Sequence, residues 1–180
     1  MAEALPQLKL HDLGSGMPGL TAFCGGLLAE SAAVCFEDRA HSPGVIIGVR
    51  CIEAKQFAVH WPAVTDQQRR SYNDLQWATE MGAYGVAILI VKAVTGKKVI
   101  ERSRKGTGFD YWIGDSDEDD LIFTNKVRLE VSGILQGSEN DIAGRLKKKR
   151  AQVKTSDHLG IAAYIAIIEF GQPLAHLEMK

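Results

Sequence analysis

The segment from Asp74 to Thr95 constrains the fold most, because its apolar and small residues recur with the spacing of an α-helix. One stripe of the segment consists of Leu75, Ala78, Gly82, Val86, Leu89 and Ala93. Asp74 stands where a helix N-cap is expected, and Gly96 stands where a glycine commonly ends a helix. The pattern predicts a core helix whose small residues allow a close approach to a β-sheet.

Strand-like and helical segments alternate after this helix. β-branched and aromatic residues predict strands at Lys98–Arg102, Gly106–Trp112, Lys126–Gly133 and Ala162–Phe170. A second helix is predicted at Glu139–Val153, where Ser138 and Asp141 have the spacing of a capping box. The expected order from Asp74 onward is helix, strand, strand, strand, helix, strand.

Residues 1–64 are predicted to be rich in β-structure. Val45–Cys51 and Phe57–Trp61 are strand-like and are joined by short turns, and Ala32–Phe36 is interpreted as a further strand. These segments predict an N-terminal antiparallel β-meander. We interpret this part either as a dimer surface, which would make the protein a homodimer, or as an extension of the sheet.

The length and composition favour one domain over residues 1–180, with a core at residues 65–172. With 46% hydrophobic residues in 180, the chain can bury one good core. The fold class expected is α/β (α+β), with a central mixed sheet and flanking helices. A net charge of −1 excludes a global attraction to nucleic acid or to membranes, so any polyanion must bind to a local basic face.

Cysteine usage and hydropathy indicate a cytoplasmic location. Cys24, Cys35 and Cys51 form no CxxC pair, which is typical of reduced, buried thiols in a cytosolic protein. The N-terminus has no signal-peptide pattern, and the most apolar run, Val86–Val91, is too short to span a bilayer. We therefore expect no membrane partner.

Two carboxylates stand in neighbouring predicted strands. A period of two places Lys126, Arg128, Glu130 and Ser132 on one face of their strand, while Asp110 belongs to the preceding strand. If the strands pair, Asp110 and Glu130 point into the same space and repel each other. A divalent cation removes this repulsion, and Mg²⁺ suits a site with one or two carboxylates. The pattern predicts a metal site at these two acids.

The acids and their order resemble the PD-(D/E)XK (restriction-endonuclease-like) nuclease superfamily. The resemblance rests on Glu80 in the first helix, Asp110 in the second strand and Glu130-Val131-Ser132 in the third, and it spans Asp74–Phe170. It implies a core of the order αβββαβ. It also implies hydrolysis of phosphodiesters in nucleic acid, DNA in the first place, with Mg²⁺ or Mn²⁺ as the cofactor.

The same resemblance implies a role for each acidic residue. Asp110 and Glu130 would bind the metal, with the backbone carbonyl of Val131 as a further ligand. Glu80 would complete a second metal position or orient water. The chain departs from the family pattern at Ser132, where the family has a lysine.

Other cations could replace the missing lysine. Lys126 and Arg128 precede Glu130 on the same strand face, and Lys105 lies just before the Asp110 strand. Lys105 is the first choice, because Gly106 and Gly108 would let the chain fold it toward the site. Contacts to the nucleic-acid backbone are expected from Arg102, Arg104, Arg128, Lys147 and Lys148.

Two other functions remain open at this stage. Because Ser132 carries no charge, the chain could be a catalytically inactive nuclease-fold module that binds nucleic acid or a protein partner. The segment Gly14–Gly19 has the form GxGxxG, and Glu37 and Asp38 follow a predicted strand about where a Rossmann fold binds a ribose. A protein that binds a nucleotide or S-adenosylmethionine is therefore the second alternative.

Overall fold

A mixed eight-stranded sheet forms the centre of the computed structural model, which describes residues 4–116 and 123–180. The strand order is β1-β3-β2-β8-β7-β6-β5-β4. The strands are β1 (Gln7–Lys9), β2 (Val45–Arg50), β3 (Lys55–His60), β4 (Lys98–Arg102), β5 (Tyr111–Ser116), β6 (Phe123–Ile134), β7 (Ala163–Glu169) and β8 (Leu174–Met179). The α-helices are α1 (Ala22–Asp38), α2 (Asp66–Ser71), α3 (Leu75–Thr95) and α4 (Glu139–Val153). Two 3₁₀ helices, η1 (Leu10–Ser15) and η2 (Lys154–Leu159), complete the described elements.

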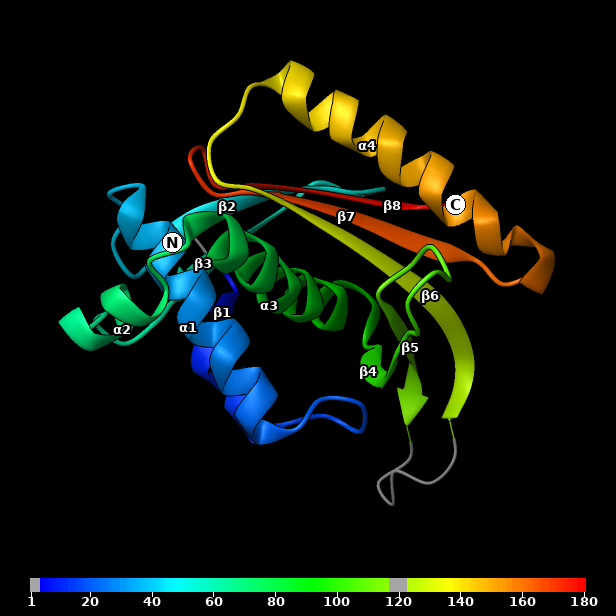
Figure 1. The fold of residues 1–180 in the computed structure, drawn as a ribbon, viewed down its shortest axis with the longest axis horizontal. Coiled ribbons are helices and arrows are strands. Elements are labelled where there is room, and N and C mark those ends of the chain that lie inside the picture. Colours follow the sequence, from blue (N-terminus) through cyan, green and yellow to red (C-terminus); the bar gives the residue numbers. More distant parts are fainter. Residues whose placement is uncertain (1–3, 117–122) are drawn as a thin grey trace.

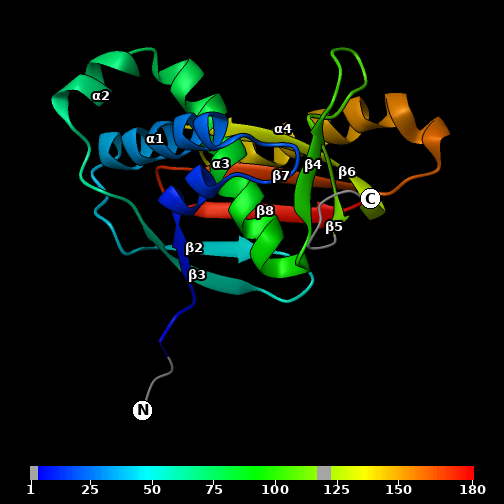
Figure 2. The same cartoon turned by 90° about the horizontal axis from the view of Figure 1, so that it is seen from below.

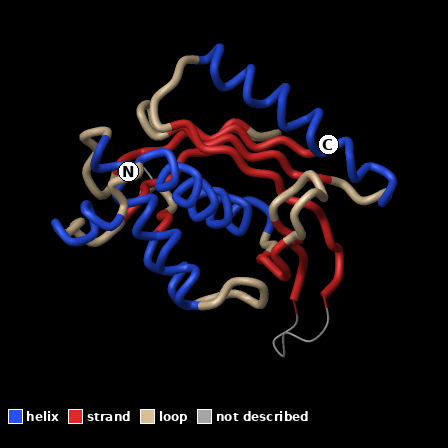
Figure 3. The backbone as a smooth tube through the Cα atoms, viewed as in Figure 1, coloured by secondary structure: helices blue, strands red, loops and turns tan. Residues whose placement is uncertain are grey.

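Helices cover the sheet on both faces (Figure 1). Helices α1 and α3 pack together on one face, and Figure 2 shows them in front of the sheet with α4 behind it. The tube in Figure 3 shows the same three layers. The predicted fold class, a mixed sheet with flanking helices, is thus confirmed.

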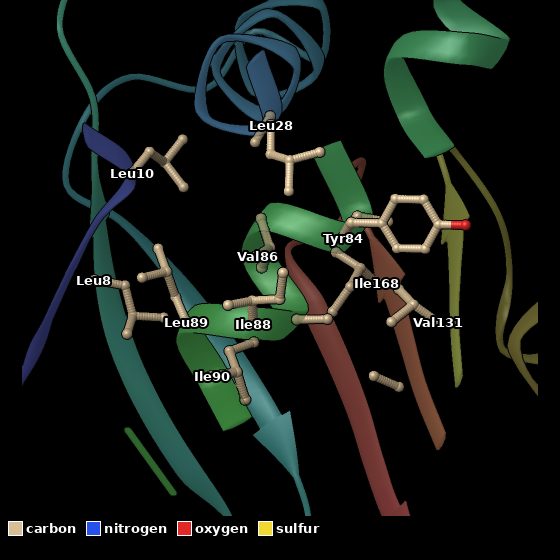
Figure 4. Close-up of a cluster of buried hydrophobic side chains, with 14 of the residues drawn as sticks. Leu8, Leu10, Leu28, Tyr84, Val86, Ile88, Leu89, Ile90, Val131 and Ile168 are labelled. Carbon is tan, nitrogen blue, oxygen red and sulfur yellow. The ribbon is translucent and has the colours of Figure 1, made fainter. Parts of the chain in front are cut away.

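Helix α3 is the core helix that the sequence predicts. The Asp74 side chain accepts hydrogen bonds from two backbone N–H groups of the first turn, and Gly96 ends the helix with a left-handed φ of 76°. By length and composition α3 could cross a membrane, but 67% of its most apolar 18-residue window is buried within the protein. Figure 4 shows Val86, Leu89 and Ile90 of α3 among core side chains. Burial of this kind is typical of a core helix.

Helix α3 approaches β6 so closely that only glycine fits at one position. A Cβ added to Gly133 would lie 2.5 Å from the carbonyl oxygen of Thr79 and 2.9 Å from the Cβ of Ala83. Gly133→Ala should therefore lower the free energy of unfolding by about 2 kcal/mol through overpacking, or roughly 4–8 °C in melting temperature. Gly144→Ala is the control, because Gly144 in α4 has no atom within 4 Å of the added Cβ. It should stabilise the protein by about 0.5–1 kcal/mol. Equal melting temperatures for the two variants would contradict this packing.

The N-terminal part differs from the predicted antiparallel meander. Ala32–Phe36, predicted as a strand, lies within helix α1. Strands β2 and β3 do form an antiparallel pair, but β1 pairs with β3 in parallel. Helix α1 is buried on most sides by α3 and η1, so its sequence lacks a clear polar stripe. This part extends the sheet, as one of the two interpretations has it, and the dimer surface stays a prediction.

Two further elements were placed wrongly or missed. Residues predicted as a strand at Gly106–Trp112 are mostly a turn, and β5 begins only at Tyr111. Strand β8 was not predicted, although it joins the N-terminal strands to the rest of the sheet by pairing with both β2 and β7. Among the cysteines, Cys35 is buried as expected, but Cys24 is exposed.

Candidate active site

The candidate site lies where β6 extends beyond its neighbour β5. Strand β5 pairs with β6 no further than Leu129, whereas β7 pairs with β6 as far as Ile134. The end of β6 therefore has one unpaired edge. Asp110 lies at the start of this edge: its N–H donates to the Leu129 carbonyl, and its Oδ2 accepts from the N–H of Val131, both at 2.9 Å.

Glu130 is fully buried beside Asp110. One oxygen, Oε1, accepts a hydrogen bond from Lys149 of α4, and Oε2 has no hydrogen-bond partner among the described residues. Burial, followed by the charge of Asp110, raises the pKa of Glu130 to about 8, and Lys149 acts in the opposite direction. The two acids thus converge, as the strand pattern predicted. A carboxylate pair of this kind must hold a proton or a cation near neutral pH.

Helix α4 supplies the cations of the site. Lys149 contacts Glu130, and Nη1 of Arg145 donates to Oγ of Ser132 at 3.2 Å. The two cations are four residues apart and so lie on one face of α4. Ser132, which the resemblance places where the family has a lysine, thus lies beside a cation of α4.

Helix α3 brings Tyr84 between two acids. The Tyr84 hydroxyl donates to Oδ1 of Asp110 at 2.9 Å and lies 3.4 Å from Oε1 of Glu80. Glu80 is exposed, and in residues 4–116 and 123–180 no group of three or more His, Cys, Asp or Glu residues could hold a metal ion. Glu80 therefore forms no such group with Asp110 and Glu130 in the described residues, and its role at a second metal position or in orienting water stays a prediction.

Two hollows meet at Glu80 and Tyr84, next to Asp110, whereas the buried Glu130 lines neither of them. The larger, of about 630 Å³, lies between α3 and α4 over the free end of β6, and its lining includes Val131, Ser132, Arg145 and Lys149. The second, of about 450 Å³, lies at the turn before β5, and its lining includes Arg102, Arg104, Lys105 and Asp110. Glu80 and Tyr84 line both hollows. Basic residues thus line both hollows.

The predicted substitutes for the missing lysine have different positions. Lys105 is exposed in the turn that lines the smaller hollow, and Lys126 is exposed four residues before Glu130. Arg128 is only 2% exposed and donates to the backbone carbonyls of Val153 and Ile161. The prediction that Arg128 contacts nucleic acid is therefore wrong, because its guanidinium group holds η2 and the adjacent loop in place.

Lys147 and Lys148, the two residues of α4 predicted to contact phosphate, line neither hollow of the candidate site. Lys147 lines another hollow, together with Arg150, Lys154 and Lys180. Lys148 is exposed on α4. Lys149 was not selected from the sequence, although it has a detectable signal: it stands three residues after Leu146 and four before Val153, both buried against the sheet. A lysine on the buried face of an amphipathic helix needs an acidic partner.

Packing and backbone conformation account for Gly16 and Gly19 of the Gly14–Gly19 segment, whereas a Cβ on Gly14 would meet no atom within 4 Å. The N–H of Gly19 donates to the Val99 carbonyl of β4 at 3.0 Å, and a Cβ at Gly19 would lie 2.4 Å from the backbone of Glu101. Gly16 adopts a left-handed φ of 78°. Gly16 and Gly19 are therefore required by the fold whether or not a nucleotide binds.

Comparisons of the chain with protein-family models, with curated proteins and with solved structures found no match. The central feature of the site is the pair formed by Asp110 and Glu130, with Lys149 beside it.

Proposed function

We propose that the chain is a divalent-metal-dependent hydrolase of phosphodiester bonds in nucleic acid. The observation that carries the proposal is the environment of Glu130: a buried acid beside Asp110, with one oxygen bound by Lys149 and the other without a hydrogen-bond partner among the described residues. A buried oxygen of this kind needs either a proton shared with Asp110, which accords with the raised pKa of Glu130, or a bound cation.

The oxygen atoms at the open edge of β6 fit Mg²⁺ or Mn²⁺. Within a strand, the N–H and C=O of one residue point to the same side, so the Val131 carbonyl shares the side on which its N–H contacts Asp110. The carboxylates of Asp110 and Glu130 and this carbonyl are hard ligands of the type that Mg²⁺ prefers. When bound, the ion would neutralise charge on a phosphate and lower the pKa of a water molecule.

Residues of the chain would then orient the substrate. Lys149 holds Glu130 and lines the larger hollow, where its ammonium group can stabilise negative charge on a phosphate. Arg145 lines the same hollow, and Arg104 and Lys105 line the smaller one. These local cations offer phosphate contacts despite the net charge of −1. Membership of the PD-(D/E)XK superfamily, with Lys149 in place of the motif lysine, belongs to this proposal.

The test is cleavage of plasmid DNA, single-stranded DNA and single-stranded RNA. We expect cleavage of at least one substrate with Mg²⁺ or Mn²⁺ and none with a chelator present. Mn²⁺ should also raise the melting temperature, because it binds only the folded site. Cleavage that persists in Asp110→Ala and Glu130→Ala would show that this site is not responsible.

A catalytically inactive binding module is the second candidate. It is favoured by one observation, namely that Lys149 already partly neutralises Glu130 without a metal. Under this alternative, Mn²⁺ leaves the melting temperature unchanged, while nucleic acid still binds to the basic residues around the hollows. The melting experiment therefore separates the two candidates.

A further inference from the structure

Tyr84 lies at the boundary between the core and the two hollows. Its side chain belongs to the buried cluster, and Figure 4 shows its hydroxyl pointing away from the apolar side chains. The hydroxyl donates to Asp110 at 2.9 Å. A tyrosine hydroxyl carries its proton at neutral pH, so it can act as the donor in this bond.

Both oxygens of Asp110 are held by donors from different elements. Oδ1 accepts from Tyr84 of α3, and Oδ2 accepts from the N–H of Val131 in β6, each at 2.9 Å. Two such bonds fix both the position and the rotation of the carboxylate plane. Each oxygen keeps further lone-pair capacity with which to bind a cation.

The Tyr84 ring is itself held on two sides. It packs edge-to-face against Tyr111, with ring centroids 5.5 Å apart. The guanidinium group of Arg102 lies 4.8 Å from the Tyr84 ring and 4.6 Å from the Tyr111 ring, and it donates to the Tyr111 hydroxyl at 2.6 Å. Cation–π contacts of this geometry are attractive, so the ring has little freedom to turn away from Asp110.

We infer that Tyr84 is a positioning residue that orients Asp110 for metal binding, and that Arg102 and Tyr111 hold Tyr84 in place. This inference rests on the proposed function. Partners that orient a metal ligand typically change metal affinity or activity by roughly 10- to 100-fold when they are removed. Tyr84 also contacts Glu80, so one hydroxyl links the acid on α3 to the acid before β5.

Tyr84→Phe tests the inference, because it removes the hydroxyl and keeps the ring. We expect Mn²⁺ affinity, measured by calorimetry without nucleic acid, to fall by about tenfold. With nucleic acid, kcat at limiting Mn²⁺ should fall while KM for the nucleic acid stays constant, and excess Mn²⁺ should restore kcat. Tyr72→Phe is the matched control: Tyr72 is equally buried and its hydroxyl donates to Glu30 at 2.8 Å, yet it lines neither hollow of the site.

The outcomes separate this inference from the proposed function. If the wild-type protein does not bind Mn²⁺, the proposed function fails. If it binds Mn²⁺ and Tyr84→Phe binds it as tightly as Tyr72→Phe does, only the role of Tyr84 is overturned. Arg102→Lys provides a second test should Tyr84→Phe not fold: it keeps the positive charge near Asp110 but loses the planar guanidinium group over the Tyr84 ring, and it should weaken Mn²⁺ binding by less than direct removal of the hydroxyl. Unchanged affinity in that variant would overturn the inference.

Discussion

Lys149→Met should lower kcat for metal-dependent cleavage by about a hundredfold to a thousandfold, the usual effect of removing one group that stabilises charge in a transition state. Lys149 is the cation that contacts Glu130, and it also lines the larger hollow. Lys147→Met is the matched control, since Lys147 lies two residues away on α4 and lines a separate hollow. It should change kcat by no more than about twofold, as expected of a surface substitution away from the site.

The Lys149→Met variant should remain folded. Without the ammonium group, burial and Asp110 raise the pKa of Glu130 further, because Lys149 is the partner that opposes them. Glu130 can then take up a proton in place of the lost charge, which avoids an unpaired buried carboxylate. Melting curves and far-ultraviolet circular dichroism check this point. Equal losses of kcat in Lys147→Met and Lys149→Met would contradict a specific role of Lys149 in catalysis.

The sequence predicts those helices well whose ends are marked by capping residues. Asp74 and Gly96 delimit α3, and Ser138 with Asp141 forms the capping box that begins α4. Helix α1 was misread because its small residues pack against α3: a Cβ on Gly82 would lie 2.8 Å from the Cα of Ala32. A helix buried on several sides loses the polar stripe on which a helical assignment depends.

Some residues of the site could likewise be predicted from local patterns, whereas others depend on the packing of distant elements. The pairing of β5 with β6 brings Asp110 and Glu130 together, because Asp110 directly precedes β5 and its N–H still donates to Leu129 of β6. Lys149 and Tyr84 reach them from helices on opposite faces of the sheet, and their contacts depend on how each helix crosses β6, which no local pattern specifies. Arg128 shares a strand face with Glu130, but η2 folds over it and uses its donors.

The pH dependence of stability should change in Glu130→Gln. The pKa of Glu130 is raised to about 8 in the folded protein, above its ordinary value of 4.5. The protonated form is therefore favoured by folding, and its stabilising contribution is complete below pH 4.5 and is lost as the pH rises through about 8. Glu130→Gln mimics the protonated form at every pH. Relative to the wild type, its free energy of unfolding should thus rise between these pH values by up to about 1.4 kcal/mol per pH unit.

Urea unfolding without metal, at pH values from 5 to 8.5, measures this difference. Glu139→Gln is the control, since Glu139 is exposed and its pKa is lowered by Arg50, so its curve should run parallel to that of the wild type in this range. A metal must displace the proton that Glu130 holds below pH 8, so Mn²⁺ binding should release about one proton and tighten with rising pH in the wild type. Glu130→Gln has no such proton to release. The free energies of unfolding of Glu130→Gln and the wild type could instead differ by a constant amount from pH 5 to 8.5. Glu130 would then be ionised throughout this range, and Asp110 and Glu130 would not repel each other strongly enough to favour a metal ion.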